Sequence, residues 1–455
     1  MSVPAVSIVV LTHDGRDHLA TCLASLAADG WPSGDVEVVV VDNGSTDGTA
    51  SLVRTDFPAV RLLPAGRNLG FAPGVRFGAQ ECRGETLVLL NNDTKVEKGW
   101  LSALVSALDA AGRDVAAVTG RIVSWDGTKV DYRDTLLTFD GHAFQKDFGR
   151  PLADVRDDAP GAARLAPCGG NMAIRKETFL SHGGFDDDFF AYLEDVDFGL
   201  RLASRGLGTA YEPRAVVRHR SGATGEALGI FNRGFLIEKN AFATFFKNVD
   251  DELRIALLPA VLLTFLHRTE RILRETAPDG GVLTIDPYRD GGGSGGRAVA
   301  PRGLRRRAVH AVARLLGVAV PESGPDLAGE HALSSLRALH RIAVDLPRLE
   351  EKRRENERLR TVPTRAIFER FRPAIVPTYP GDEELFSSEA FTSLLPPGLD
   401  LSREHLPLIR LRLAEHGRLL FETLWRRLQN PPARVSRVAA LALVEGMTGG
   451  PLSMA

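Results

Sequence analysis

Residues 1–90 alternate between short apolar runs and segments in which apolar residues recur at helical spacing. The apolar runs cover 6–11, 37–41, 60–63 and 87–90, and the spacing of Leu19, Leu23 and Leu26 is typical of the segments between them. Strands that alternate with helices predict βαβ units and a parallel sheet. Because the runs are continuously apolar, we expect a sheet that is covered on both faces.

Polar turns follow three of these runs, at Thr-His-Asp 12–14, Asp-Asn 42–43 and Asn-Asn-Asp 91–93. Ligands of open α/β sheets bind at the carboxyl ends of the strands, so the three turns are expected to converge. There, Asp93 can hold a divalent cation that binds a diphosphate, and Asp42 suits a ribose hydroxyl or a base N–H. The alternative is that these are ordinary turn residues. That explanation is adequate for any one turn, but it accounts less well for three polar turns at a single edge of the sheet.

Residues 115–166 are predicted to add a further strand to the sheet and an insertion over the active site. Residues 115–123 have a strand pattern, whereas 124–166 are polar, weakly patterned and expected to form the insertion. Gly169 and Gly170 then precede another short apolar run, and glycines there allow the backbone to pass close to a ligand.

A dense acidic stretch opens the helix that is predicted after residue 193. Its carboxylates are Glu194, Asp195 and Asp197, and aromatic residues stand just before them at 189, 190 and 192. Attraction to the helix dipole explains one or two of the carboxylates without any function. The aromatic residues are expected to form a sugar-stacking or water-excluding wall, in which a carboxylate can act as a general base.

His219 follows a short strand pattern at 215–217. Neutral imidazole is a common ligand of transition-metal cations. A histidine among arginines is nevertheless more often a surface residue, and the local pattern leaves both readings open.

The second half of the chain is predicted to be mainly helical, with helices over 236–246, 253–272, 304–320, 333–360, 365–371 and 406–428. Residues 276–303 are rich in Gly and Pro and favour a linker. The apolar run 255–266 suits either an interfacial helix or a helix packed in a dimer or domain contact. No catalytic motif follows residue 245.

Composition narrows the classes of protein. A chain of 455 residues with 44% hydrophobic and 25% charged residues suits a globular protein of about two or three domains. A net charge of −2 argues against nucleic acid as a partner. Three scattered cysteines favour a reducing compartment. The N-terminus has no basic segment before its apolar run, so no signal peptide is expected.

Seven motifs in order resemble the inverting family 2 glycosyltransferases of GT-A fold, especially the bacterial rhamnosyltransferase-like members. They are VSIVVLTHDG, VVVVDNGSTDGT, RNLGFAPG, LVLLNNDT, GGNMAIRKETF, GGFDDDFFAYLEDVDFGLRL and VRHRSGAT. The resemblance covers about residues 6–245 and implies a GT-A-type, Rossmann-like, mostly parallel sheet with flanking helices, followed by a mainly α-helical C-terminal region. It implies a glycosyltransferase domain at 1–245, a helix plus Gly-rich linker at 246–303 and a mainly helical domain at 304–455.

The resemblance also assigns roles to residues. The nucleotide-sugar site would include Thr12, Asp42, Asn43, Asn68, Asn91, Asn92, Gly170 and Arg201, the last of them facing the diphosphate. Asp93, the one acidic residue of the DXD-type motif, and His219 would hold a divalent cation, Mn²⁺ or Mg²⁺. Asp195 of the Glu194–Asp195 pair would be the catalytic base. Pro73 and Arg76 depart from residues that are frequent in the family.

The implied function is a sugar transfer with inversion, from dTDP-rhamnose or a UDP-sugar to a hydroxyl of a glycan or lipid-linked acceptor in surface polysaccharide biosynthesis. A cytoplasmic enzyme is expected, with peripheral contact at the inner face of the membrane and homo-oligomerisation both open. The alternative is a catalytically weak nucleotide-sugar-binding scaffold that acts through its helical half.

Overall fold

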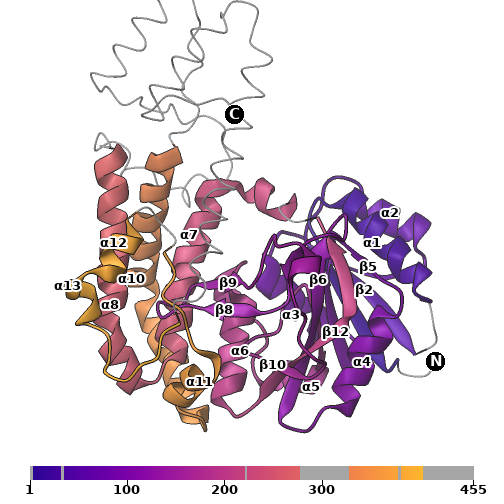
Figure 1. Ribbon diagram of the computed structural model, residues 1–455. Coiled ribbons are helices and arrows are strands. Elements are labelled where there is room, and N and C mark those ends of the chain that lie inside the picture. Colours follow the sequence, from indigo (N-terminus) through magenta and orange to yellow (C-terminus); the bar gives the residue numbers. More distant parts are fainter. Residues whose placement is uncertain (1–3, 32–34, 221–222, 277–326, 378–380, 403–455) are drawn as a thin grey trace, which may run out of the picture.

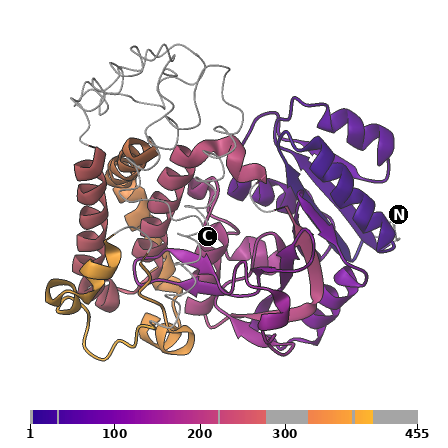
Figure 2. The same ribbon diagram turned by 45° about the horizontal axis from the view of Figure 1, so that its top comes forward.

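The computed structural model of the protein describes residues 4–31, 35–220, 223–276, 327–377 and 381–402. A twisted sheet with helices on both faces forms one part, and long helices stand beside it (Figures 1 and 2). The predicted linker at 276–303 and the predicted helices at 304–320 and 406–428 lie outside the described residues, apart from Thr276 at the end of α8.

The strands are β1 (Val6–Thr12), β2 (Val36–Asp42), β3 (Arg61–Pro64), β4 (Thr86–Asn91), β5 (Thr94–Val96), β6 (Val115–Ser124), β7 (Val130–Tyr132), β8 (Thr135–Leu137), β9 (Ala143–Gln145), β10 (Ala162–Arg164), β11 (Asn171–Arg175) and β12 (Gly208–His219). The helices around the sheet are α1 (Arg16–Ala28), α2 (Thr49–Asp56), α3 (Phe71–Glu81), α4 (Trp100–Ala110), α5 (Lys176–Ser181) and α6 (Glu194–Ser204), with 3₁₀ turns η1 (Leu152–Asp154) and η2 (Asp187–Phe189). The remaining helices are α7 (Ala223–Asn248), α8 (Asp251–Thr276), α10 (Leu327–Leu359), α11 (Thr364–Phe371), α12 (Asp382–Ser387) and α13 (Glu389–Thr392).

The main sheet has the order β10-β12-β6-β11-β4-β1-β2-β3, with β5 added on β12 and β7 on β6. The strands β3, β2, β1 and β4 are parallel, as predicted, whereas β11 runs antiparallel to both β4 and β6. The sheet is therefore mixed, with a parallel half that carries the first three polar turns. The 124–166 segment contributes β7 and β10 to this sheet and the separate β8–β9 hairpin, which the weak pattern did not indicate.

Alternate residues of the central strands enter two separate cores, which confirms a sheet covered on both faces. Ile8 and Val10 pack in the core that includes residues of α1 and α4, while Val9 packs in the core that includes residues of α3, α5 and α6. Full burial of such side chains stabilises the fold by about 1.5–3 kcal/mol each.

The helix α6 lies between the sheet and the long helices. Phe198 and Leu202 pack in the core of the sheet, whereas Val196 and Leu200 pack with residues of α7 and α8 in a third core. Because its two faces are both buried, α6 joins the two parts of the structure. The position of its first residues therefore depends on both.

The long helices confirm a mainly helical region after the sheet. The helix α7 begins at Ala223, earlier than its apolar pattern predicted, and residue 245 lies inside it. The boundary proposed at 245–246 remains a prediction. No helix among the described residues is long and apolar enough to cross a membrane.

The apolar run 255–266 lies on α8 and is packed on one side only. Leu257 is fully buried, whereas Ile255, Leu262 and Leu266 are 65%, 40% and 57% exposed. The run therefore belongs to a packed helix that also presents an apolar stripe to its surroundings.

Candidate active site

The three polar turns do meet at one edge of the sheet. In the register of the parallel strands, Thr12 pairs with Asp42 on β2, and Leu11 pairs with Asn91 on β4. The amide of Asn92 donates to the Thr12 hydroxyl at 2.9 Å, which ties the first turn to the third. The predicted convergence of Thr12, Asp42, Asn91 and Asn92 is thus present in the structure.

Asn43 and Asn68 hold the second turn against the loop that precedes α3. The Asn43 amide donates to the Asn68 carbonyl oxygen at 3.0 Å and to the Gly70 carbonyl at 3.1 Å, and its own oxygen accepts from Leu69 N–H. Asn43 is only 2% exposed. Its side chain therefore shapes the turn beside Asp42, whose carboxylate accepts from Ser45 N–H at 2.9 Å.

Asp93 and His219 come together at the same edge. Pairing of β5 with β12 sets Thr94 opposite His219, and the Asp93 Oδ1 lies 3.2 Å from His219 Nε2. The other ring nitrogen lies 3.0 Å from Asp131 Oδ2. Burial works to lower the pKa of His219, but the hydrogen bonds to Asp131 and Asp93 outweigh it and raise the pKa to about 10.

Asp131 is the residue of this edge that sequence reasoning missed. It lies on β7, inside the weakly patterned insertion, and is 3% exposed. A carboxylate that accepts the second N–H of a metal-binding imidazole orients the ring and makes it a stronger ligand. No motif spacing marks Asp131, because the insertion brings it to His219 across 88 residues of chain.

The donor set fits a divalent cation that is shared with a substrate. The Asp93 and His219 atoms are close enough to contact one ion, which would replace the proton between them, and carboxylate oxygen and imidazole nitrogen suit Mn²⁺. No cluster of three or more His, Cys, Asp or Glu side chains that could hold a metal occurs in the described part of the chain. Further ligands would thus come from phosphate oxygens and water, as is usual for Mg²⁺ at nucleotide sites.

Asp195 is positioned by the glycine turn that precedes β11. Its Oδ2 accepts from Gly169 N–H at 3.0 Å, and its Oδ1 accepts from Val196 N–H at 2.8 Å. A Cβ on Gly170 would lie 2.8 Å from the Asn91 amide, so the turn passes directly against the end of β4. This contact places the turn that holds Asp195 next to the third polar turn.

Burial raises the pKa values of both carboxyls of the Glu194–Asp195 pair. For Asp195, the hydrogen bonds from Gly169 and Val196 partly offset this effect. For Glu194, the charges of Asp195 and Asp197 add to it, and the buried Glu194 Oε2 has no hydrogen-bond partner among the described residues. A carboxylate whose pKa is raised toward neutrality is a more effective general base.

The pair follows a strained turn. The carbonyl of Phe189 accepts from Ala191 N–H at 2.7 Å, which closes a three-residue turn around Phe190 at φ 60° and ψ −64°. Tyr192 and Leu193 also have positive φ, at 72° and 66°. Such conformations cost of order 1–3 kcal/mol each and are found where the surrounding structure enforces them, commonly at active sites.

Two expectations about this segment are wrong. Arg201 does not face a diphosphate: its guanidinium donates to Asp197, to the His182 carbonyl and to the Gly184 carbonyl, and the residue is 7% exposed. All three of its nitrogens are thus used inside the protein. Phe189 is 1% exposed and belongs to a core, so only Phe190 and Tyr192 of the aromatic group are accessible enough to form a wall.

The two departures from the family pattern lie on α3. Pro73 falls in the first turn of the helix, where a missing N–H costs little. Arg76 reaches Asp187 of η2 at 2.9 Å, in a half-exposed ion pair.

Comparisons with known proteins show the family of the chain. Residues 7–179 match the family model for Glycosyl transferase family 2. The chain is 34% identical over 244 residues to N-acetylglucosaminyl-diphospho-decaprenol L-rhamnosyltransferase of Mycobacterium tuberculosis, an alignment that covers 48% of this chain and 77% of that protein. The chain therefore belongs to glycosyltransferase family 2 and is rhamnosyltransferase-like.

Two other similarities cover less of the other protein. The O-antigen biosynthesis protein RfbC of Myxococcus xanthus is 30% identical over 232 residues, which cover 49% of this chain and 18% of that protein. A solved structure of GalNAc-T7 with UDP, GalNAc and Mn²⁺ superposes with a TM-score of 0.45 and 18% identity, over 57% of this chain and 51% of that one. No functional conclusion follows from a structural likeness of that degree.

Proposed function

We propose that this protein transfers a sugar, with inversion at the anomeric carbon, from a nucleoside diphosphate to a hydroxyl of a glycan or lipid-linked acceptor in surface polysaccharide biosynthesis. dTDP-rhamnose is the first donor to test, because the M. tuberculosis relative is named as an L-rhamnosyltransferase; UDP-sugars are the second. That relative's name also supports a diphospho-lipid acceptor. The observation that carries the proposal is the placement of Asp195 beside the edge that holds Asp93 and His219.

In this mechanism Asp195 removes the proton from the acceptor hydroxyl. The acceptor oxygen forms a bond to the anomeric carbon from one face, while the bond from that carbon to the diphosphate breaks on the other and its electrons pass to the phosphate oxygen. Asp42 and the turns at 12–14 and 91–93 bind and orient the nucleotide. A divalent cation held by Asp93 and His219 would neutralise charge on the leaving diphosphate.

Gly169 has a defined part in this chemistry. Its N–H holds the Asp195 carboxylate at 3.0 Å and so fixes the direction of the base. Phe190 and Tyr192 are suited to exclude water from the acceptor. Exclusion of water strengthens the electrostatic interactions at the reacting atoms.

The first test is a calorimetric titration with dTDP, UDP, GDP and CDP, each with and without Mn²⁺. We expect one nucleotide to bind in a metal-dependent manner, and Asp93→Asn to abolish the metal dependence while the fold is retained. Transfer from the matching sugar nucleotide to a synthetic N-acetylglucosaminyl-diphospho-lipid then tests the reaction. Absence of binding by every nucleotide would refute the enzyme and leave a protein that acts through its helical region.

A further inference from the structure

The strained turn before Glu194 is held by side chains of α7. Asn240 is fully buried, and its amide nitrogen lies 3.0 Å from the Phe189 carbonyl, 2.8 Å from that of Ala191 and 2.7 Å from that of Tyr192, so its two N–H groups are shared among three acceptors. No hydrogen-bond partner of its oxygen is found among the described residues. The side chain therefore points its N–H donors at the turn, to which all three acceptors belong.

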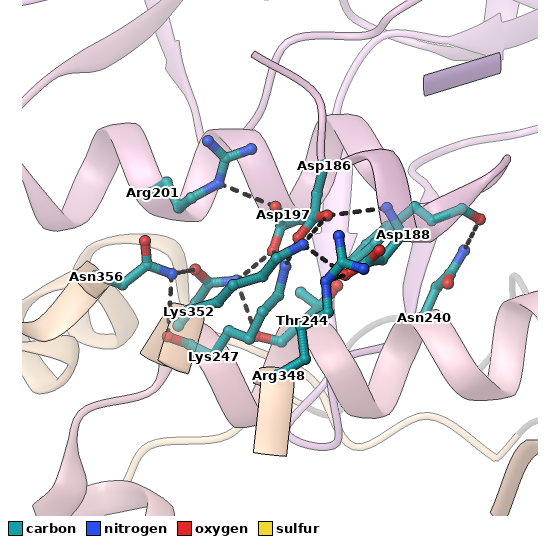
Figure 3. Close-up of polar contacts among 12 residues, drawn as sticks. Asp186, Asp188, Asp197, Arg201, Asn240, Thr244, Lys247, Arg348, Lys352 and Asn356 are labelled. Atoms are coloured by element: carbon teal, nitrogen blue, oxygen red, sulfur yellow. Dashed lines mark hydrogen bonds and ion pairs between the residues drawn. The ribbon is translucent and has the colours of Figure 1, made fainter. Parts of the chain in front are cut away.

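The two ends of the turn are clamped by a buried lysine. Lys247 of α7 contacts Asp186, which precedes the turn, and lies 2.9 Å from Asp197, which follows it inside α6 (Figure 3). Burial lowers the pKa of Lys247, but the Asp197 and Asp186 charges outweigh it and raise the pKa above its usual value. Lys247 is therefore a cation that links both sides of the catalytic pair.

The helix α10 adds a second layer to the clamp. Lys352 lies 2.5 Å from Asp186 and 2.6 Å from Asp188, and Arg348 lies 2.8 Å from Asp188 (Figure 3). Residues more than a hundred positions after the turn thus bind the carboxylates that precede it. The described helices after the sheet are connected to the site through these contacts.

We propose that Asn240 is a positioning residue for Asp195, and that Lys247 and Lys352 complete a brace through which α7 and α10 keep the turn in its strained form. The inference rests on the proposed function for its kinetic part. A strained turn relaxes when its restraints are removed, and a shift of about 1 Å in a reacting group can cost about 100-fold in rate. The brace would explain why this chain carries long helices beside its transferase fold.

The test compares wild type, Asn240→Ala and Thr264→Ala by hydrogen exchange and by kinetics. Thr264 is the control, because it is a buried polar residue on α8 whose hydroxyl donates to the Ala260 carbonyl of its own helix at 2.8 Å. For Asn240→Ala we expect faster exchange in the peptide that covers 186–197, a fall in kcat of about 10- to 100-fold, and dTDP or UDP affinity within about threefold of wild type. For Thr264→Ala we expect kcat and exchange in 186–197 to match wild type.

Lys352→Met provides a second test, because Lys352 is partly exposed and its loss leaves Lys247 and Arg348 in place. We expect the same changes at smaller amplitude, with recovery in Lys352→Arg. Unchanged turn exchange and unchanged kcat in both Asn240→Ala and Lys352→Met would overturn the brace; if Asn240→Ala does not fold, Lys352→Met decides. A turn that opens in Asn240→Ala while wild type transfers no sugar would refute the proposed function and leave the brace standing.

Discussion

Replacement of Asp195 by asparagine is expected to separate catalysis from folding at this site. Asparagine keeps the shape of the side chain. Its amide oxygen can still accept from Gly169 N–H, which in wild type lies 3.0 Å from the Asp195 carboxylate. It loses one of two backbone hydrogen bonds, at a cost of about 1 kcal/mol. Against this, the pKa of Glu194 is raised by burial and by the Asp195 charge, so removal of that charge relieves a repulsion. We expect the two effects nearly to offset, with little change in Tm.

The expected catalytic loss is much larger. General-base assistance contributes about 10²- to 10⁴-fold, which corresponds to about 3–5 kcal/mol of transition-state free energy. In wild type, kcat should fall as the pH drops through the raised pKa of Asp195, so its acid limb lies above the ordinary aspartate value. Asp195→Asn should remove most of kcat and also the acid limb of the pH profile.

The assay is release of the nucleoside diphosphate during transfer, with nucleotide affinity measured by calorimetry. Glu194→Gln is the matched control: burial and the charges of Asp195 and Asp197 raise the pKa of Glu194 and so favour its protonated form, which glutamine resembles in shape. A rate for Asp195→Asn within a few-fold of wild type would refute the assignment of the base. Loss of rate in Glu194→Gln alone would move the role to Glu194.

Three further predictions concern buried polar residues, Arg201, Asp131 and His142. Arg201→Met should lower the free energy of unfolding by about 3 kcal/mol in urea titrations, because it removes buried hydrogen bonds such as the one to the Gly184 carbonyl. Lost nucleotide affinity at unchanged stability would contradict this structural role of Arg201. Asp131→Asn should weaken Mn²⁺-dependent nucleotide binding by about 10- to 100-fold, because it removes the carboxylate that orients His219; metal-free binding serves as the control. Burial lowers the pKa of His142, but the charges of Asp140 and Glu238 outweigh it and raise the pKa to about 10. The stability that this charge contributes should be complete below pH 6.5 and lost as the pH rises through 10. His142→Asn should therefore flatten that part of the pH–stability curve, and an unaltered curve would refute the charge.

The residues that the sequence identified correctly share a local signal. The strands at 6–11 and 87–90 are recognisable because their apolar runs are longer than a turn and shorter than a helix. The polar turns that follow them converge because parallel strands in register end at one edge. The roles given to Asp93 and Asp195 remain predictions for the assays above.

The errors and omissions share a different cause. Arg201 stands one helical turn beyond Asp197, and the sequence does not show that its guanidinium turns inward to the His182 and Gly184 carbonyls. The sequence predicts Phe189 in an aromatic wall with its neighbours. Its burial is not visible there, because a 3₁₀ turn that buries one aromatic side chain and leaves the next partly exposed has no sequence period.

The sequence by itself determined the βαβ order, the edge of the sheet that carries the polar turns and the family. These follow from hydrophobic period and from short motifs, in which every residue acts on near neighbours in the chain. Only the tertiary structure decided that Asp131 supports His219, that Asn240 holds the turn before Glu194 and that Lys352 reaches Asp186. Each of these is a contact between polar groups far apart in the chain, which folding brings together and burial makes strong, because in a low-dielectric interior a polar group must find its partner.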